Sequence, residues 1–509
     1  MAYVIAGDCC SDASCVAVCP MNSIHPAGGL DGLFIDPRTC IDCGACADVC
    51  PVGAAKPAEQ ATPVEVELNR SYFASSPVVD ALDLDTWEPP SFTAWSGGPR
   101  RVAVVGAGPA GMYATRELLL RSTAEVTLYD RLAVVGGLAR FGVAPDHPMT
   151  KQILSTFSRI INHPRVTWRP GVEANALELE SRYDAVVHAV GSFTSRRLGI
   201  PGEDAAGSCP ASEVVAWYNG RPGVGELPVS LRGPRAVIVG NGNVALDLAR
   251  LLVSNERRLA DLDLPPAVRA ALATSGITEV VILGRRGPEA AAYSDSAFHD
   301  LLTLEGVEVV LDDADLSRST GGSRLSGPSP RSDAPPATAN QPLPPVERDT
   351  PPTHNRQSAE RWGGERGAGL AGNGVEGAMD PPRGVRRGQT DLWAPPLPGR
   401  RIVLRFETSP TAWDPAVGLT TDRGVVSAGN LFTAIGFVGQ PIPGLPFDQA
   451  LGIVPNEAGA VVGRPGHFVA GWIKRGARGG IGANKACAEE TVRSLLSEAA
   501  NRGLAGARV

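Results

Sequence analysis

Two stretches of the chain, 101–106 and 235–240, are almost continuous apolar runs that end in glycine. Strands that are buried on both faces of a parallel sheet have this pattern, whereas half-exposed strands alternate between apolar and polar residues. Each run leads into a segment with helical periodicity, so each is predicted to open a strand–helix–strand unit. Strand-like order resumes near 401–406, so the chain from about 101 onward is expected to be α/β.

Segment 312–400 interrupts this pattern with 14 prolines and 13 glycines in 89 residues. Such a composition buries too little apolar surface to offset the entropy of ordering the chain. We expect a disordered insertion or a long surface loop, and the alternative is a docking arm for a partner. Residues 58–98, which contain several prolines and little periodicity, are expected to form a linker.

Eight of the ten cysteines lie between residues 9 and 50. The N-terminus has no signal-peptide pattern, so we expect a cytoplasmic protein, in which dense cysteines indicate metal rather than disulfides. Cys40, Cys43, Cys46 and Cys50 are separated by two, two and three residues, and a proline follows. This spacing is typical of bacterial iron–sulfur ferredoxins, in which the fourth cysteine ligates the other of two clusters.

The same pattern occurs 31 residues earlier with one change, because Cys9, Asp12, Cys15 and Cys19 take the places of Cys40, Cys43, Cys46 and Cys50. The register favours Cys9 over its neighbour Cys10 as a ligand. With the fourth cysteines exchanged, Cys19 completes a four-thiolate [4Fe–4S] site, and Cys50 joins a site with only three thiolates. A carboxylate is a poor ligand for such iron, so we expect [3Fe–4S] there. The alternative is [4Fe–4S] with Asp12 or solvent on the fourth iron.

The first apolar run continues as Gly106-x-Gly108-x-x-Gly111 at the start of a helix. Glycines allow a tight turn there, and the helix N-terminus can receive a pyrophosphate. The next expected strand, 125–130, ends in Asp130, whose carboxylate can accept a hydrogen bond from a free ribose hydroxyl. Together these features predict a site for a dinucleotide without a 2′-phosphate, which we assign to FAD.

The second run continues as Gly240-x-Gly242-x-x-Ala245. Its following strand, 279–283, leads to Arg285 and Arg286 instead of an acid. Guanidinium groups can hold a 2′-phosphate through paired, charge-assisted hydrogen bonds, whereas a carboxylate would repel it. The second site is therefore predicted to bind NADP(H).

A glycine-rich turn near the C-terminus follows an expected strand at 467–472 and precedes a helix from about 483. The N-terminus of that helix would favour negative charge on a reduced flavin. Trp472 is expected to line the edge of the flavin ring, and a buried core tryptophan is the alternative.

Size and charge limit the remaining classes of function. A chain of 509 residues predicts about three domains. The formal net charge of −7 offers no overall basic field for nucleic acid. Since no run of about 18 apolar residues occurs, no membrane span is expected.

Beyond residue 100, apart from 312–400, the chain resembles the adrenodoxin-reductase-like ferredoxin–NADP reductases. The resemblance is carried by 106–111, 141–148, 200–204, 240–247, 284–288 and 471–481. The cysteine-rich part resembles the seven-iron bacterial ferredoxins, and some members of the reductase family carry such a domain at the N-terminus. The expected fold is an α+β ferredoxin-like iron–sulfur domain at 1–57, followed by an α/β two-domain, Rossmann-type flavoprotein reductase. In that reductase, 99–194 and 433–509 would bind FAD, and 195–432, which contains the insertion, would bind NADP.

The resemblance also implies site residues. For FAD they are Gly106, Gly108, Gly111, Asp130, Leu138, Val172, Trp472, Gly479, Gly480 and Ile481, and for NADP they are Arg196, Asn241, Gly242, Asn243, Val244, Arg285, Arg286 and Gly479. His147 and Asp300 match family positions near the flavin, where they would manage its proton or simply position the rings. The sequence departs from the family at Asp130, which replaces a glutamate, and at Ala290 and Ala297, which replace Gln and Glu in the grip on NADP.

These parts predict hydride transfer between NADPH and FAD, coupled to single-electron transfer with the clusters. The resemblance implies an external redox partner such as a ferredoxin, a cytochrome P450 or another ferredoxin-dependent enzyme. Two alternatives are an electron-feeding subunit like the small subunit of glutamate synthase, whose cysteine spacing differs, and a non-catalytic redox sensor.

Overall fold

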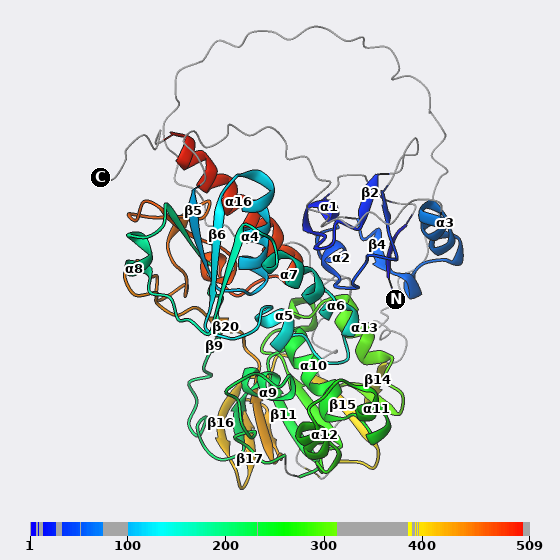
Figure 1. Cartoon of the computed structure of the whole chain (residues 1–509). Helices are drawn as coiled ribbons and strands as arrows, with labels where there is room; N and C mark the ends of the chain where they lie inside the picture. The colour runs from blue at the N-terminus through cyan, green and yellow to red at the C-terminus, as the bar shows by residue number, and fades with distance from the viewer. Residues whose placement is uncertain are drawn as a thin grey trace, which may run out of the picture. The chain divides into compact units, whose positions relative to one another are not determined.

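The computed structural model describes residues 2–6, 9, 14–26, 33–50, 52–74, 100–231, 233–312, 385–388, 392, 394 and 396–501 (Figure 1). Most of the expected insertion at 312–400 therefore lies outside the described residues, as do Cys10 and Asp12. No helix within the described ranges is both long and apolar enough to cross a membrane.

The N-terminal unit contains two copies of one arrangement. Its elements are β1 (Tyr3–Ile5), α1 (Ser14–Val18), β2 (Ile24–Pro26), β3 (Leu33–Ile35), α2 (Ala45–Val49) and β4 (Ala55–Pro57). β1 pairs antiparallel with β4, and β2 pairs antiparallel with β3. The bounds of α2 and β4 lie 31 residues after those of α1 and β2, so the repeat in the cysteine spacing is also a repeat in structure.

The expected linker at 58–98 begins with ordered elements, η1 (Ala58–Gln60) and α3 (Pro63–Ala74). The Asn69 side chain of α3 accepts a hydrogen bond from the Ile35 backbone N–H at 2.9 Å and donates one to the Ile35 carbonyl at 2.5 Å. Asn69 and Phe73 are the buried residues of this helix, which explains why its sequence shows so little periodicity. The N-terminal unit thus extends to residue 74.

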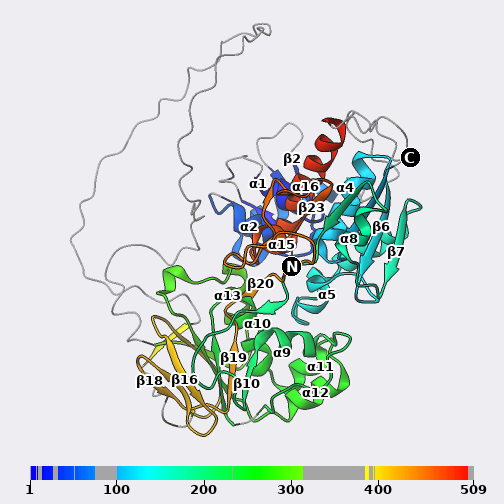
Figure 2. The ribbon, with the colours of Figure 1, turned by 90° about the vertical axis from the view of Figure 1, so that its left-hand side faces the viewer.

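The first large sheet has seven strands in the order β21-β22-β23-β8-β5-β6-β7. Its members are β5 (Arg101–Val105), β6 (Glu125–Asp130), β7 (Val166–Pro170), β8 (Ala185–His188), β21 (Asn456–Glu457), β22 (Ala460–Val461) and β23 (His467–Val469). The five strands from β23 to β7 are parallel. Helices α4 (Pro109–Arg121) and α16 (Ile481–Asn501) pack together over one face, and α8 (Ala176–Glu180) covers the other (Figure 2).

The second large sheet is parallel throughout, in the order β10-β19-β11-β12-β15-β13-β14. Its members are β10 (Ser208–Pro210), β11 (Arg235–Val239), β12 (Glu279–Leu283), β13 (Val307–Asp312), β14 (Val385–Gly388), β15 (Arg400–Arg405) and β19 (Asn430–Thr433). β14 lies inside the segment expected to be disordered, so regular structure resumes earlier than the composition indicates. A three-stranded sheet packs against one face, formed by β16 (Pro410–Asp414), β17 (Gly418–Thr421) and β18 (Gly424–Val426).

The described chain beyond residue 100 has two halves, each built from one large sheet and its helices. In the first half these are α5 (Leu138–Phe141), α6 (Pro148–Lys151), α7 (Ile153–Ile161) and α15 (Trp472–Arg475). In the second they are α9 (Ala211–Tyr218), α10 (Asn243–Leu252), α11 (Glu256–Asp261), α12 (Pro266–Ala273), η2 (Pro288–Ala290) and α13 (Asp295–Leu302). The chain crosses between the two sheets at β9 (Thr194–Ser195) and returns at β20 (Phe437–Val438), and these two short strands pair with each other.

Candidate functional site

A cavity of about 1690 Å³ is lined by residues of both large sheets and of the N-terminal unit. Pockets for one drug-sized ligand span about 300–1,000 Å³, so this cavity has room for more than one such molecule. It brings together most of the residues predicted for the cofactors, namely Gly106, Gly108, Asp130, Leu138, His147, Val172, Arg196, Asn243, Val244, Asp300, Trp472, Gly479, Gly480 and Ile481.

Five predicted residues do not line this cavity: Gly111, Asn241, Gly242, Arg285 and Arg286. A Cβ atom on Gly111 would lie 1.8 Å from the Gly106 carbonyl oxygen, so this glycine allows the helix to pack against the turn. Arg285 and Arg286 are exposed just beyond the end of β12, where a ligand can reach them from solvent.

The first glycine turn joins β5 to α4. Gly106 has a φ of +106°, and a Cβ atom there would lie 2.4 Å from the Ala189 carbonyl oxygen. Asp130 supports the turn, because its Oδ2 accepts the Ala107 backbone N–H at 2.7 Å and its Oδ1 accepts that of Leu132 at 2.8 Å. A carboxylate oxygen has a second lone pair, so Asp130 can still accept a ribose hydroxyl.

The second glycine turn repeats this geometry between β11 and α10. Gly240 has a φ of +113°, and a Cβ atom there would lie 2.3 Å from the Ala434 carbonyl oxygen. The Asn243 side chain at the start of α10 accepts the Ser294 backbone N–H at 2.8 Å and donates to the Ser294 hydroxyl at 3.3 Å. Both turns thus present a helix N-terminus at the end of a buried strand, which suits a pyrophosphate.

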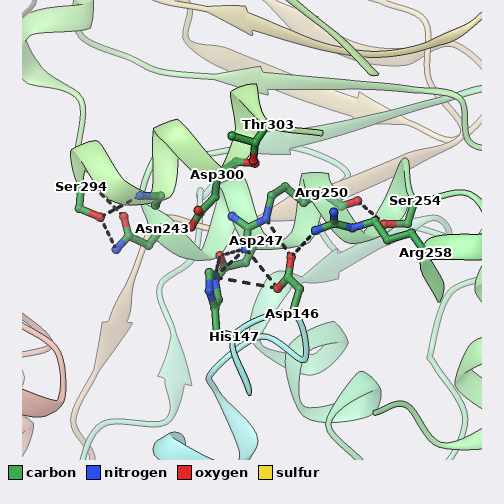
Figure 3. Close-up of polar contacts among 11 residues, drawn as sticks. Asp146, His147, Asn243, Asp247, Arg250, Ser254, Arg258, Ser294, Asp300 and Thr303 are labelled. Carbon is green, nitrogen blue, oxygen red and sulfur yellow. Dashed lines mark hydrogen bonds and ion pairs between the residues drawn. The ribbon is translucent and has the colours of Figure 1, made fainter. Parts of the chain in front are cut away.

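A network of charged side chains joins the two halves beside the cavity (Figure 3). Arg250 of α10, only 1% exposed, donates to the Asp146 carboxylate at 3.0 and 3.2 Å and to Asp247 Oδ1 at 2.8 Å. Arg258 donates to Asp146 Oδ2 at 3.0 Å. Burial raises the pKa of Asp146, but Arg250, His147 and Arg258 outweigh this effect and lower the pKa to about 2. Asp146 therefore remains a carboxylate.

His147 follows Asp146 and belongs to the same network. Its Nε2 lies 2.7 Å from Arg250 Nη2 and 3.4 Å from Asp247 Oδ1. Burial and Arg250 lower the pKa of His147, but the hydrogen bond to Asp247 and the charges of Asp247 and Asp146 outweigh them and raise it above the usual value. The same nitrogen cannot accept from Arg250 and donate to Asp247 at once, so a proton on Nε2 favours the contact with Asp247 and opposes that with Arg250.

Trp472 is half-buried and lines the cavity rather than filling the core. Its indole N–H donates to the Gly479 carbonyl at 3.1 Å, which ties it to the glycine-rich turn. Its ring centroid lies 5.7 Å from that of Phe437 on β20.

The predicted cysteine ligands gather in the N-terminal unit. Six of them, Cys9, Cys15, Cys19, Cys40, Cys46 and Cys50, belong to one apolar cluster, and Cys43 packs against the core of the first large sheet and lines the cavity. Burial raises the pKa of the Cys43 thiol to about 12, so cluster binding has to displace its proton. Among the described residues, no three His, Cys, Asp or Glu side chains converge tightly enough for a single metal ion, and an iron–sulfur cluster is wider than one ion.

Two backbone N–H groups point at predicted ligands in matching places of the repeat. Ser23 N–H donates to Cys19 Sγ and Ala54 N–H donates to Cys50 Sγ, both at 3.2 Å. Hydrogen bonds of this kind favour the thiolate and occur around iron–sulfur clusters. The donor set therefore fits iron–sulfur ligation.

Comparison with known proteins places the chain. Residues 33–56 match a family model described as "4Fe-4S binding domain", and 100–313 match one described as "Pyridine nucleotide-disulphide oxidoreductase". A "Probable ferredoxin/ferredoxin–NADP reductase" of Mycobacterium tuberculosis is 36% identical over 522 aligned positions, which cover 98% of this chain and 84% of that protein. The chain belongs to the ferredoxin/ferredoxin–NADP reductase family.

Two further similarities cover the reductase part alone. "NADPH-ferredoxin reductase FprA" of M. tuberculosis is 34% identical over 79% of this chain and 85% of its own length. The solved structure "Mycobacterium tuberculosis FprA in complex with NADPH" has a TM-score of 0.62 and 31% sequence identity, with the same shares covered. The predicted fold class and the prediction of a flavoprotein oxidoreductase are thus confirmed.

The N-terminal unit, which extends to residue 74, is called the ferredoxin unit from here on, and the chain from residue 100 is called the reductase. The contact between the two was not predicted. Lys485 donates to the Cys19 carbonyl at 2.9 Å, Tyr113 to the Pro20 carbonyl at 3.4 Å and Thr150 to the Ile41 carbonyl at 3.2 Å. In each case a reductase side chain holds the backbone of a loop that carries predicted cluster ligands. The partners are far apart in the chain, so no local sequence pattern could have revealed them.

Proposed function

We propose that this chain is a ferredoxin–NADP(+) oxidoreductase in which electrons pass between NADPH and its own iron–sulfur clusters by way of FAD. The observation that carries this proposal is that one cavity is lined by the first glycine turn, by Asn243 and Val244 of the second, and by Cys43 of the ferredoxin unit. When bound, FAD converts the electron pair of a hydride into the single electrons that clusters accept.

The two nucleotides would divide between the two turns. FAD would occupy the turn at Gly106, with Asp130 accepting a ribose hydroxyl, and 99–194 and 433–509 would form its domain. NADP(H) would occupy the turn at Gly242, within 195–432. Arg285 and Arg286 would hold the 2′-phosphate, and their exposure at the end of β12 keeps them accessible to it.

His147 and Asp300 would act where the nicotinamide and the flavin meet. Both line the cavity, and both lie beside the buried Arg250 network (Figure 3). A histidine with a raised pKa can hold and release a proton near neutral pH. A purely positioning role for the pair remains the alternative.

The two clusters would lie at different distances from the cavity. Cys40, Cys43, Cys46 and Cys19 would bind a [4Fe–4S] cluster on the side of the reductase, since Cys43 lines the cavity and Cys19 contacts Lys485. Cys9, Cys15 and Cys50 would bind the second cluster, expected to be [3Fe–4S]. That cluster would exchange electrons with a cytoplasmic partner such as a ferredoxin, a cytochrome P450 or another ferredoxin-dependent enzyme.

Anaerobic stopped-flow mixing of the reconstituted chain with NADPH tests this function. Flavin absorbance should fall first, and the cluster signal should follow. Cys43→Ser should abolish the second phase while NADPH-driven ferricyanide reduction persists. Flavin that stays oxidised with excess NADPH would refute the proposal, and negligible turnover of ferricyanide would favour a sensor.

The two arginines give a second, independent test. Charge-assisted hydrogen bonds contribute about 1.5–3 kcal/mol each, so Arg285→Ala with Arg286→Ala should raise the KM for NADPH by at least about ten-fold. The KM for NADH should not change, because NADH lacks the 2′-phosphate. An equal effect on both nucleotides would show that these arginines do not read that phosphate.

A further inference from the structure

Lys485 lies on α16 of the reductase and is only 8% exposed. Its ammonium group donates to the Cys19 carbonyl at 2.9 Å and to the Asn22 side-chain oxygen. Both acceptors are neutral, although a buried lysine usually pairs with a carboxylate. Among the residues that the structure describes, the carboxylates that raise its pKa, Glu117 and Glu489, are instead paired with arginines of the reductase.

The internal repeat shows what is unusual about this contact. Asn22 corresponds to Gly53 one repeat later, and both have a left-handed backbone, with φ of +50° and +69°. Glycine adopts that conformation without strain, whereas asparagine does so less readily. At Gly53 no side chain is needed, whereas at Asn22 the side chain supplies an oxygen for Lys485.

The repeat also separates the effect of lysine from that of the backbone. The N–H···S hydrogen bonds to Cys19 and Cys50 are both 3.2 Å long, so the two sulfur atoms receive equivalent hydrogen bonds from the backbone. The Lys485 ammonium, in contrast, donates its hydrogen bond to the loop that carries Cys19.

From these contacts we infer that Lys485 is a positioning residue, which fixes the Cys19 loop against the reductase and raises the reduction potential of the cluster bound through Cys19. The inference rests on the proposed function, since it takes that cluster to be the one that receives electrons from FAD. Reduction adds a negative charge to a cluster, and a nearby positive charge stabilises that charge. Net charge and hydrogen bonding are among the factors that set the potentials of such clusters. The lysine would therefore favour electron flow from FAD into the ferredoxin unit.

The test is a mediated redox titration of the full reconstituted chain, followed by the EPR signal of the reduced [4Fe–4S] cluster. Lys485→Gln keeps donors for both acceptors but removes the charge. It should lower the reduction equilibrium constant of this cluster by roughly ten-fold, which is about 59 mV for a one-electron couple. Lys485→Arg keeps the charge and should stay close to the wild-type potential. The flavin potential should not move in either variant.

Lys474 provides a matched control. It is 7% exposed on α15 and donates to Glu490 and Thr491, both within the reductase. Lys474→Gln removes an equally buried charge and should leave the cluster potential unchanged. Asn22→Gly copies the repeat at Gly53, removes one acceptor but keeps the ammonium, and should retain most of the wild-type potential.

An unchanged cluster potential in Lys485→Gln would overturn the inference, as would an equal shift in Lys474→Gln. Loss of the cluster in both Lys485→Gln and Lys485→Arg would also overturn it, because the lysine would then serve folding alone. The titration uses mediators rather than NADPH. It can therefore fail while the stopped-flow experiment succeeds, and the two proposals are refuted separately.

Discussion

Replacing Arg250 by methionine should destabilise the protein strongly, because Arg250 is the buried centre of the network between the two halves. Its side chain is 1% exposed, and it bonds the carboxylates of Asp146 and Asp247, which are 11% and 14% exposed. Removing one partner of a buried ion pair costs about 3–5 kcal/mol, since the remaining charge is buried without compensation. Arg258 still contacts Asp146 at 3.0 Å, so we expect a loss near the lower limit, about 3 kcal/mol.

The measurement is the free energy of unfolding from urea titration of the FAD-loaded chain, in a cycle of Arg250→Met, Asp146→Asn and the double variant. Partners in one network couple by about 0.5–3 kcal/mol, so the double variant should lose less than the sum of the single variants by at least about 0.5 kcal/mol. Arg493→Met removes an exposed pair with Glu489 and should change stability by no more than about 1 kcal/mol. If the loss of stability in the double variant equals the sum of the losses in the two single variants, the network is refuted.

The same network predicts how stability depends on pH. The pKa of Asp146 is lowered to about 2 in the folded protein, against about 3.9 for an unperturbed aspartate. Its contribution is therefore fully present above pH 4 and is lost as pH falls toward 2. In Arg250→Met the pKa of Asp146 should rise, because the positive charge that opposes the effect of burial is then smaller. The loss of stability in acid should therefore begin at a higher pH.

Three further substitutions test other parts of the site. Asp247→Asn removes the main group that raises the pKa of His147, so any step in the rate of flavin reduction that follows this histidine should move to lower pH in stopped-flow profiles. Gly482→Ala would put a Cβ atom 2.2 Å from the Val18 carbonyl oxygen, and it should slow cluster reduction many-fold while NADPH–ferricyanide activity persists. Gly106→Ala combines a left-handed φ with a clash at 2.4 Å, and the purified variant should have lost most of its flavin absorbance.

Sequence reasoning succeeded where one local pattern is tied to one geometry. The turns at Gly106 and Gly240 need glycine because a carbonyl oxygen lies where a Cβ atom would be, and that requirement is written in adjacent residues. The 31-residue repeat likewise predicted that Cys19 and Cys50 occupy equivalent places, and equal hydrogen bonds to their sulfur atoms agree with this.

The same reasoning missed features that depend on long-range packing. Helix α3 buries only two residues, so it has no amphipathic pattern to detect. β14 adds to the edge of a sheet through backbone hydrogen bonds with β13, and these need no particular side chains. The contact of Arg250 with Asp146 joins residues 104 positions apart, and that of Lys485 with Cys19 joins residues 466 apart.

The first large sheet takes β5 to β8 from early in the reductase and β21 to β23 from its end, whereas the strands of the second all lie between them. Domains tend to fold as units while the ribosome extends the chain from its N-terminus. The ferredoxin unit and the second sheet can then form during translation, while the first sheet waits for β23. Because α16 follows β23, the Cys19 loop of the nascent ferredoxin unit gains its contact with Lys485 only after the strands of both large sheets have been synthesised.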